Sequence, residues 1–368
     1  MPVEGAKDLR RIPSWATALT LTLAVAVSPG VAPAVAEPAV TAVPVATGLN
    51  SPVSFTLAPD GQLVYVERHT GWLRFRDLQT GVDQQVHRIG NVNSEGERGA
   101  FGVALHPAWP GTPLVYVFAT RNTAAGPQNQ VLRIRIENGD GVAMKSILSV
   151  PTGPATQHIG GRIAFGPDKK LYVVIGDNAE PANSQDLTSN LRGKILRLNP
   201  DGSTPATNPF DSPIWAYGLR NSIGFAFDPV TGRLWQQDNG PECNDELNRI
   251  VKGANHGWGP RQACPNTNNS GPTPRIFPKH TLVDTIGLTG VAFCEGCGLS
   301  PELEGDLLVG AVTDGTIRRL DLNATRSGFA SGPILVVDMP GPVLSMETGP
   351  NGDLFFSDFS AIYRLEPA

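Results

Sequence analysis

The sequence repeats one short unit, and this repeat restricts the possible folds more than any other feature. Each unit has an apolar approach, a turn resembling Pro-Asp-Gly and a short apolar run, as in Leu57-Ala-Pro-Asp-Gly-Gln-Leu-Val-Tyr-Val66. Five copies keep the turn proline, at Pro59, Pro107, Pro167, Pro229 and Pro350, which are 48, 60, 62 and 121 residues apart. The long interval holds a sixth copy without proline, Glu304 to Val309. Turns of this kind between alternating apolar segments are typical of β-hairpins.

A second apolar segment that contains arginine follows each copy of the turn. These segments are residues 72–75, 131–134, 194–197, 247–250, 316–319 and 362–364. A unit of about 55 residues suits a four-stranded blade, and six blades close a ring. We therefore predict an all-β fold, a six-bladed β-propeller of four-stranded antiparallel blades. A β-sandwich is the alternative, but it would not repeat one signature six times.

The first 36 residues have the pattern of a signal peptide. Lys7, Arg10 and Arg11 precede an apolar run at 15–27, and Ala34-Val35-Ala36 offers small residues for cleavage before Glu37. We predict cleavage near Ala36, a secreted or periplasmic protein, and a single propeller domain over residues 37–368. An uncleaved membrane anchor is the alternative. No second apolar stretch follows, so no membrane span is expected in the mature chain.

The charge balance argues against a polyanionic partner. Cleavage would reduce Lys plus Arg from 29 to 29 − 3 = 26 and Asp plus Glu from 34 to 34 − 2 = 32, which gives a net charge of −6. A mildly acidic protein without a basic run is a poor candidate for binding nucleic acid or an anionic membrane.

All four cysteines lie within 55 residues of each other in the predicted exported part. Export permits disulfides, and four cysteines allow three pairings. We predict Cys243–Cys264 and Cys294–Cys297. The Cys-Glu-Gly-Cys spacing also suits redox or zinc chemistry, but zinc would require a second pair with similar spacing.

Three polar clusters interrupt the repeat, and the first surrounds His158 and Asp177. His158 precedes an apolar strand and is followed by Gly160 and Gly161, which would let another molecule approach the backbone. Asp177 ends the partner strand of the same hairpin, so both side chains can face one mouth of the channel. A carboxylate that orients an imidazole makes the ring a general base. The alternative is a loop histidine beside a turn-capping aspartate.

The second and third clusters lie around the fourth copy of the repeat. Arg220-Asn221 precedes a buried strand and can bind a carboxylate or a polarised carbonyl, or can merely join adjacent blades. The third cluster runs from Asp238 to Glu246 and continues to Trp258. Its carboxylates and free backbone carbonyls suit calcium, although acidic loops are more often only solvated.

At these three clusters the sequence resembles the glucose/sorbosone dehydrogenase family, soluble six-bladed quinoproteins that use pyrroloquinoline quinone and calcium. The similarity covers about residues 45–366. In the first cluster it rests on His-x-x-Gly-Arg with Phe-Gly-Pro-Asp and Gly-Asp, and in the second on Gly-Leu-Arg-Asn. In the third cluster it rests on Asn-Gly-Pro, Asp-Glu-Leu-Asn and Gly-Ala-Asn-His-Gly-Trp. The resemblance implies oxidation of an aldose at its anomeric carbon by hydride transfer to the quinone.

The resemblance also implies roles for individual residues. His158 would take the proton of the sugar hydroxyl, Asp177 would orient His158, and Arg220 and Asn221 would contact the quinone. The carbonyls of Gly240 and Pro241 would hold the catalytic calcium. Asp245 and Glu246 would add metal-binding carboxylates, with Glu246 at a second, structural calcium site. Glu97 and Thr313 would occupy two further cofactor-binding positions.

Four positions depart from the pattern of the family's glucose oxidisers. Thr313 stands where they have a lysine, Pro342 and Leu344 stand where they have arginines, and Glu97 stands for a glutamine. Pyrroloquinoline quinone carries three carboxylates, and each lost cation removes a charge-assisted hydrogen bond of about 1.5–3 kcal/mol. The Cys-Glu-Gly-Cys segment is also similar to family branches such as the Hedgehog-interacting proteins.

Two other functions fit these departures. One is a secreted, calcium-stabilised propeller that binds a glycan or a protein without redox chemistry. The other is a calcium-dependent lactonase, which would need several side-chain ligands around a central calcium. The sequence does not identify the sugar, the extracellular or periplasmic electron acceptor, or the oligomeric state.

Overall fold

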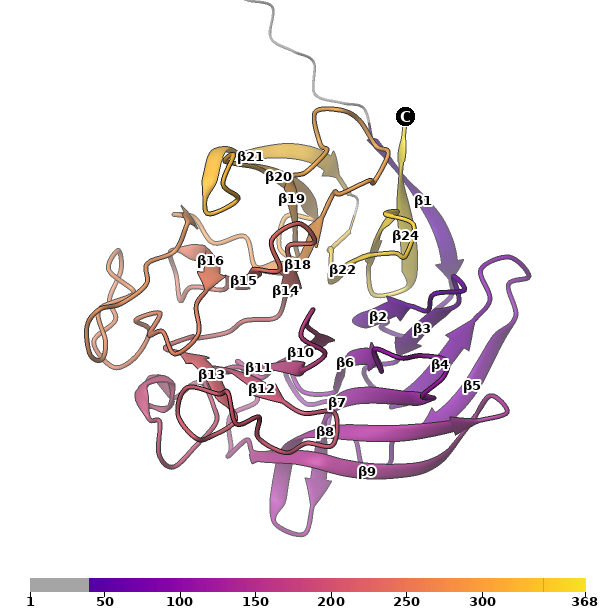
Figure 1. The fold of residues 1–368 in the computed structure, drawn as a ribbon, viewed down its shortest axis with the longest axis horizontal. Coiled ribbons are helices and arrows are strands. Elements are labelled where there is room, and N and C mark those ends of the chain that lie inside the picture. Colours follow the sequence, from indigo (N-terminus) through magenta and orange to yellow (C-terminus); the bar gives the residue numbers. More distant parts are fainter. Residues whose placement is uncertain (1–39, 340) are drawn as a thin grey trace, which may run out of the picture. The chain divides into compact units, whose positions relative to one another are not determined.

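The computed structural model describes residues 40–339 and 341–368, which form six four-stranded antiparallel sheets arranged in a ring (Figure 1). The predicted six-bladed propeller is confirmed, whereas the predicted signal peptide lies outside the described residues. Blades 1 to 3 consist of β2 (Ser54–Leu57), β3 (Leu63–Val66), β4 (Trp72–Arg76) and β5 (Asp83–Arg88); β6 (Ala100–Leu105), β7 (Leu114–Thr123), β8 (Gly126–Glu137) and β9 (Asp140–Pro151); and β10 (Gly160–Phe165), β11 (Leu171–Ile175), β12 (Lys194–Leu198) and β13 (Ile214–Tyr217).

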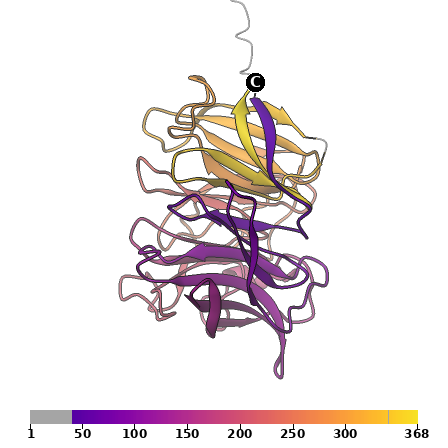
Figure 2. The same cartoon turned by 90° about the vertical axis from the view of Figure 1, so that its right-hand side faces the viewer.

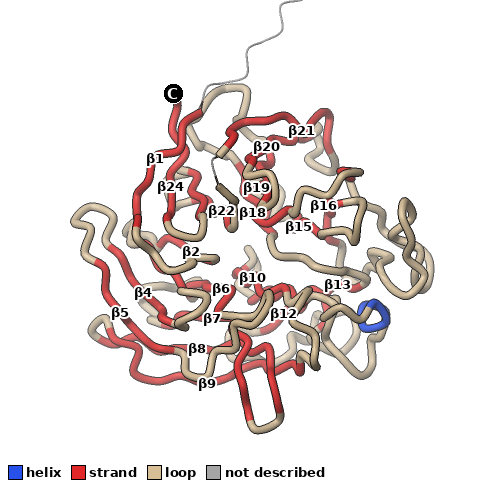
Figure 3. Tube along the Cα trace, turned by 180° about the vertical axis from the view of Figure 1, so that it is seen from behind, coloured by secondary structure: helices blue, strands red, loops and turns tan. Residues whose placement is uncertain are grey.

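Blades 4 to 6 repeat the same order from the inner to the outer strand. They consist of β14 (Phe225–Phe227), β15 (Leu234–Asp238), β16 (Asp245–Ile250) and β17 (His280–Leu282); β18 (Leu288–Phe293), β19 (Leu307–Ala311), β20 (Thr316–Leu322) and β21 (Phe329–Asp338); and β22 (Ser345–Thr348), β23 (Leu354–Ser357) and β24 (Ala361–Pro367) with β1 (Val40–Thr47). The one helical segment among the described residues is the 3₁₀ turn η1 (Pro181–Gln185), drawn in blue in Figure 3. No described helix is long and apolar enough to cross a membrane.

The ring closes where the first described strand joins the last blade. β1 pairs antiparallel with β24, so that Val40 lies opposite Pro367 and Thr47 lies opposite Ala361. Figure 2 shows the two strands side by side at the edge of the ring. Blade 6 is therefore built from both ends of the described chain.

The core consists of apolar layers between neighbouring blades. Strands such as β3 and β11 are buried along their whole length, because both faces of each blade pack against the next one. Six apolar clusters result, and each joins two successive blades; one of them combines Val64 and Leu73 of blade 1 with Val117 and Leu132 of blade 2. This packing holds the inner strands around a central channel.

The inner strands run in the same direction around that channel, which separates its two mouths. Residues that precede the inner strands lie at one mouth, which we call the upper mouth. Two cavities of about 380 and 290 Å³ lie at the opposite mouth, where the inner strands end, and both are lined by Phe165, Phe225 and Glu347. A third cavity, of about 330 Å³, is lined by Asn244, Glu246, Thr267 and Asn268 and so lies beside the third polar cluster.

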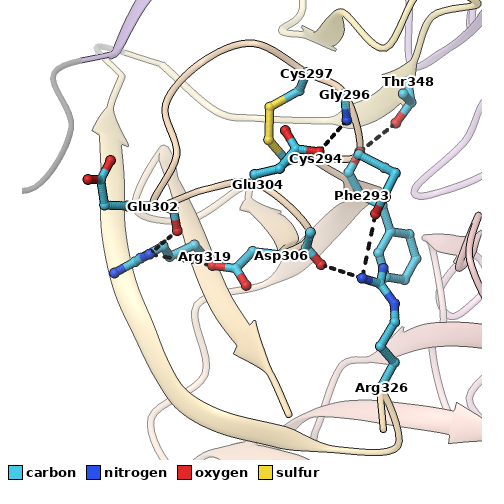
Figure 4. Close-up of a disulfide and its surroundings, with 12 residues drawn as sticks. Phe293, Cys294, Gly296, Cys297, Glu302, Glu304, Asp306, Arg319, Arg326 and Thr348 are labelled. Atoms are coloured by element: carbon cyan, nitrogen blue, oxygen red, sulfur yellow. Dashed lines mark hydrogen bonds and ion pairs between the residues drawn. A yellow bond between two sulfur atoms is a disulfide. The ribbon is translucent and has the colours of Figure 1, made fainter. Parts of the chain in front are cut away.

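Both predicted disulfides are present. Cys243–Cys264 connects the start of β16 to the long loop that follows it, and Cys294–Cys297 closes a short turn after β18. Figure 4 shows the second bond beside Glu304, which accepts a hydrogen bond from the backbone N–H of Gly296. The two sulfur atoms and Glu304 lie within 4.8 Å of one another, but the sulfurs are joined in a disulfide rather than available as thiolates for zinc.

Candidate active site

His158 and Asp177 form the centre of the upper mouth. The Nδ1 atom of His158 lies 2.7 Å from Oδ1 of Asp177, and the carboxylate is fully buried. Because an ionised carboxylate only accepts hydrogen bonds, Nδ1 is the donor in this pair, and in the neutral ring Nε2 then has the lone pair. No hydrogen bond to Nε2 is found among the described residues, so this nitrogen is available to a ligand.

The backbone around His158 adopts an unusual conformation. His158 has φ of +54°, a region that residues with a Cβ rarely occupy, and its N–H donates to Oε2 of Glu97 at 2.7 Å. Such strain persists only where the surroundings impose it, and it is concentrated at functional sites. Glu97 also accepts from Nδ2 of Asn221 at 3.3 Å, which links blades 2, 3 and 4 at this mouth.

The glycines beside His158 have a different purpose from the one we predicted. A Cβ at Gly161 would lie 2.7 Å from the Cβ of Phe101, and a Cβ at Gly160 would lie 2.8 Å from the backbone nitrogen of Gly176. Both glycines therefore admit neighbouring strands of the protein, and the prediction that they admit another molecule was wrong.

Asp177 is held by several donors besides His158. The N–H of Ala179 donates to Oδ1 at 2.8 Å, and the indole N–H of Trp258 donates to Oδ2 at 2.7 Å. The carboxylate thus caps a turn and also orients the histidine, which combines the two interpretations left open by the sequence.

A chain of hydrogen bonds supports the backbone of Asp177. Nδ2 of Asn183 donates to the carbonyl of Asp177, and the buried ammonium of Lys194 donates to the carbonyl of Asn183 at 2.6 Å. Burial lowers the pKa of Lys194 to about 7.

Arg220 and Asn221 are placed beside this pair by Asp238. The two oxygens of Asp238 accept from the backbone N–H groups of Arg220 and Asn221 at 2.8 and 2.7 Å, and the N–H of Asp177 donates to the carbonyl of Arg220. The Arg220 guanidinium donates to the carbonyl of Asn239 at 2.8 Å through one nitrogen, and no other hydrogen bond from it is found among the described residues. Its remaining donors can bind an anionic or polarised oxygen.

A small cavity of about 10 Å³ is lined by Arg220 and by oxygen-bearing side chains that suit a cation. Two buried carboxylates line it, those of Asp238 and Glu246, together with Asn244, Thr267 and Asn268. Burial raises the pKa of both carboxyls, that of Glu246 to about 7, and the proximity of Glu246 raises the pKa of Asp238 further. A divalent cation between the two groups would remove this penalty, and oxygen donors are the ligands that calcium prefers.

The Gly240-Pro241 loop and Asp245 lie next to this cavity. A Cβ at Gly240 would lie 1.8 Å from the carbonyl oxygen of Cys243, so only glycine allows the loop to fold this tightly. The two oxygens of Asp245 accept from three backbone N–H groups, those of Gly240, Ile286 and Gly287. This side chain therefore anchors the loop, and we do not assign it to the calcium.

Thr313, Pro342 and Leu344 form the other side of the upper mouth. Thr313 is exposed after β19, and its N–H donates to the carbonyl of Ile286 at 3.1 Å. Leu344 is buried before β22. None of the three side chains can supply a positive charge there.

Several buried atoms at this mouth lack partners among the described residues, namely Oδ1 of Asn221, Oδ1 of Asn239 and both polar atoms of Asn178. Such atoms suit a polar ligand.

Sequence reasoning found His158, Asp177, Glu97, Arg220 and Asn221, and the structure brings these five together. It missed Asp238 as the acceptor that fixes Arg220 and Asn221, and it missed the bond from Trp258 to Asp177. Asp238 and Trp258 stand at the two ends of the third cluster, so their place in that cluster was the only available signal.

Comparison with known proteins gives one consistent result. The sequence pattern of the glucose/sorbosone dehydrogenase family matches residues 49–361. Quinoprotein glucose dehydrogenase B of Acinetobacter calcoaceticus is 31% identical over 244 residues, which are 58% of this chain and 51% of that protein. Aldose sugar dehydrogenase YliI of Escherichia coli is 26% identical over 327 residues, 83% of this chain and 86% of that protein.

A solved structure extends the similarity to the whole propeller. The PQQ-bound form of an aldose sugar dehydrogenase from Streptomyces coelicolor superposes with a TM-score of 0.77 at 28% identity, covering 90% of this chain and 99% of that one.

Proposed function

The chain belongs to the glucose/sorbosone dehydrogenase family, and on this premise we propose that it is an exported quinoprotein that oxidises an aldose sugar at its anomeric carbon. The observation that carries the proposal is the His158–Asp177 pair, with Nε2 of the histidine left for a ligand at the same mouth as Arg220. The relatives named above are a quinoprotein glucose dehydrogenase and aldose sugar dehydrogenases.

We propose that the cofactor and the metal bind at the upper mouth. Arg220 and Asn221 would bind pyrroloquinoline quinone, with Glu97 and Thr313 at its border. The carbonyls of Gly240 and Pro241 would hold one calcium, and Glu246 would belong to a second site. When bound, the quinone supplies hydride acceptance and calcium supplies polarisation of its carbonyl.

The protein's own residues would act on the sugar and on the developing charge. Nε2 of His158 accepts the proton of the sugar's C1 hydroxyl as the hydride leaves C1. Asp177 keeps the proton on Nδ1 and stabilises the imidazolium that forms, which makes the histidine a better base. Arg220 places a positive charge where negative charge develops on the acceptor.

Dye reduction with a panel of aldoses tests the proposal. Purified protein, loaded with pyrroloquinoline quinone and calcium, should reduce an artificial dye when at least one aldose is added. Reduction should require all three components. If the protein binds the quinone by calorimetry but reduces no dye with any aldose, the proposed oxidation is ruled out. If it does not bind the quinone, it is not a quinoprotein.

A second candidate is a non-redox propeller that binds a glycan. It is favoured by Thr313 and Leu344, which remove positive charges from one side of the mouth. A glycan affinity that needs calcium and is unchanged by His158→Ala would favour this function over the first.

A further inference from the structure

Trp258 contacts both Asp177 and Arg220, yet the proposed chemistry gives it no role. It lies in the loop that follows β16, 81 residues away from Asp177 along the chain. Its indole N–H donates to Oδ2 of Asp177 at 2.7 Å, while Oδ1 of the same carboxylate holds His158. The two oxygens of Asp177 are therefore fixed by different parts of the fold, and the carboxylate cannot rotate without losing one of its partners.

The ring of the same tryptophan lies under the guanidinium of Arg220. The central carbon of the guanidinium is 5.4 Å from the centre of the ring, within the range of a cation–π contact. One rigid side chain thus supports the carboxylate that orients the base and also supports the cation. Asp177 and Arg220 are connected in the backbone as well, through the N–H of Asp177 and the carbonyl of Arg220 at 2.8 Å.

Trp258 is itself held firmly. The backbone N–H of Trp258 donates to the carbonyl of Gly218 at 3.0 Å. The backbone carbonyl of Trp258 accepts from Nε2 of Gln185, in η1, at 2.5 Å. The preceding Gly257 has φ of +91°, and a Cβ there would lie 2.6 Å from the carbonyl oxygen of Asn268. Only 5% of the tryptophan is exposed. The ring is therefore anchored before any ligand arrives.

We propose that Trp258 is a positioning residue, which fixes His158 through Asp177 and fixes Arg220 through its ring, and so sets the placement of the proton acceptor relative to the positive charge. The inference rests on the proposed function for its kinetic consequence, but not for its structural content. Outer partners of this kind commonly affect activity by 10- to 100-fold without touching the substrate. A tryptophan that only filled space would need no N–H, so the N–H is the feature to test.

Trp258→Phe removes the N–H and keeps an aromatic ring under Arg220. Trp235→Phe is the matched control, because Trp235 is a buried tryptophan in the same blade whose indole N–H has no hydrogen-bond partner among the described residues. Nitrogen-15 NMR of the full chain without cofactor reports on the His158 ring, assigned with His158→Gln. We expect Trp258→Phe to shift or broaden the His158 ring signals, and Trp235→Phe to leave them unchanged. Equal spectra for the two variants would overturn the proposal.

Asp177→Asn provides a second route if Trp258→Phe does not fold. In the otherwise unchanged chain, this variant should move the indole N–H signal of Trp258 and leave the signal of Trp235 in place. No movement of the Trp258 signal would show that the bond to Asp177 does not exist in solution, and the proposal would fail.

Kinetics of the enzyme loaded with quinone and calcium test the consequence. Trp258→Phe should lower kcat by about tenfold or more and change KM for the sugar by less than about twofold. Trp258→Leu, which also removes the ring, should in addition weaken quinone binding by roughly three- to tenfold. If the wild type reduces no dye, the proposed oxidation fails while the NMR measurements still decide the role of Trp258. If Trp258→Phe keeps the kcat of Trp235→Phe, the positioning role is wrong.

Discussion

The imidazole of His158 uses Nδ1 for Asp177 and leaves Nε2 toward the upper mouth, and the site depends on this division. Asp177→Asn would replace a pure acceptor by a group that can donate, so the ring can adopt the tautomer that lacks a lone pair on Nε2. We expect kcat to fall by about 10²- to 10⁴-fold, as for orienting aspartates in other bases. Quinone affinity should change little, because Asp177 is not assigned to the cofactor.

The control for Asp177→Asn is His106→Gln. His106 lies at the end of β6, at the opposite mouth, where it stacks on Tyr116. This variant should keep its activity, measured by dye reduction under saturating sugar. A kcat for Asp177→Asn within about threefold of the wild type would contradict the assigned role.

Glu347 should make the free energy of unfolding depend on pH. It lines the cavities at the opposite mouth, and no hydrogen bond or ion pair joins its carboxylate to another described residue. Burial raises its pKa from the ordinary value of 4.5 to about 7, although the charge of Arg162 acts in the other direction. Between these two values the unfolded chain releases the proton while the folded chain keeps it, so this residue destabilises the fold as pH rises from about 4.5 to 7.

Glu347→Gln should therefore be more stable than the wild type at pH 8, by roughly 1–3 kcal/mol. The advantage should shrink toward pH 5, where the wild-type carboxyl is protonated in the folded state. Urea unfolding at both pH values measures this difference, with the exposed Glu302→Gln as the control. An advantage that does not depend on pH would mean that Glu347 is not the titrating group.

At the scale of elements, the two disulfides should differ in what they support. Cys243–Cys264 spans 21 residues and closes the segment that carries Asn244 and Glu246, where Asn244 also donates to the carbonyl of Pro265 at 2.6 Å. Cys294–Cys297 spans three residues in blade 5. Loop-closure entropy gives about 3 kcal/mol for the first bond and about 2 kcal/mol for the second.

Cys243→Ser with Cys264→Ser should lower the free energy of unfolding and also weaken calcium binding, because it loosens the segment that carries Asn244 and Glu246. Cys294→Ser with Cys297→Ser should lower stability less and leave calcium affinity unchanged. Calcium titration by calorimetry compares the two double variants. Equal calcium affinities would show that the first bond does not organise the metal site.

The sequence predicts the strands that belong to local hairpins and misses the outer ones. The second and third strands of each blade carry the turn and the arginine-containing apolar run, and both signals lie within about 30 residues. Outer strands such as β5, with the sequence Asp-Gln-Gln-Val-His-Arg, face solvent and lack an apolar pattern. The pairing of β1 with β24 and the bond from Trp258 to Asp177 connect distant segments, and no local pattern encodes such contacts.

For the whole molecule, the ring gathers the candidate site residues at one mouth, while cavities of about 380 and 290 Å³ lie at the other. Parallel inner strands bring the residues before β6, β10 and β14 together, so that blades 2, 3 and 4 supply Glu97, His158 and Arg220. Blades 5 and 6 should complete the cofactor clamp, and there the chain has Thr313, Pro342 and Leu344. Quinone binding would therefore depend on Arg220, Asn221 and calcium.

Titration of the calcium-loaded protein with pyrroloquinoline quinone, followed by calorimetry, measures this binding. We predict one quinone per chain, binding that disappears when calcium is chelated, and an affinity that falls by about tenfold or more in Arg220→Leu but not in Trp235→Phe. Absence of saturable binding in the presence of calcium, up to about 1 mM quinone, would contradict the account.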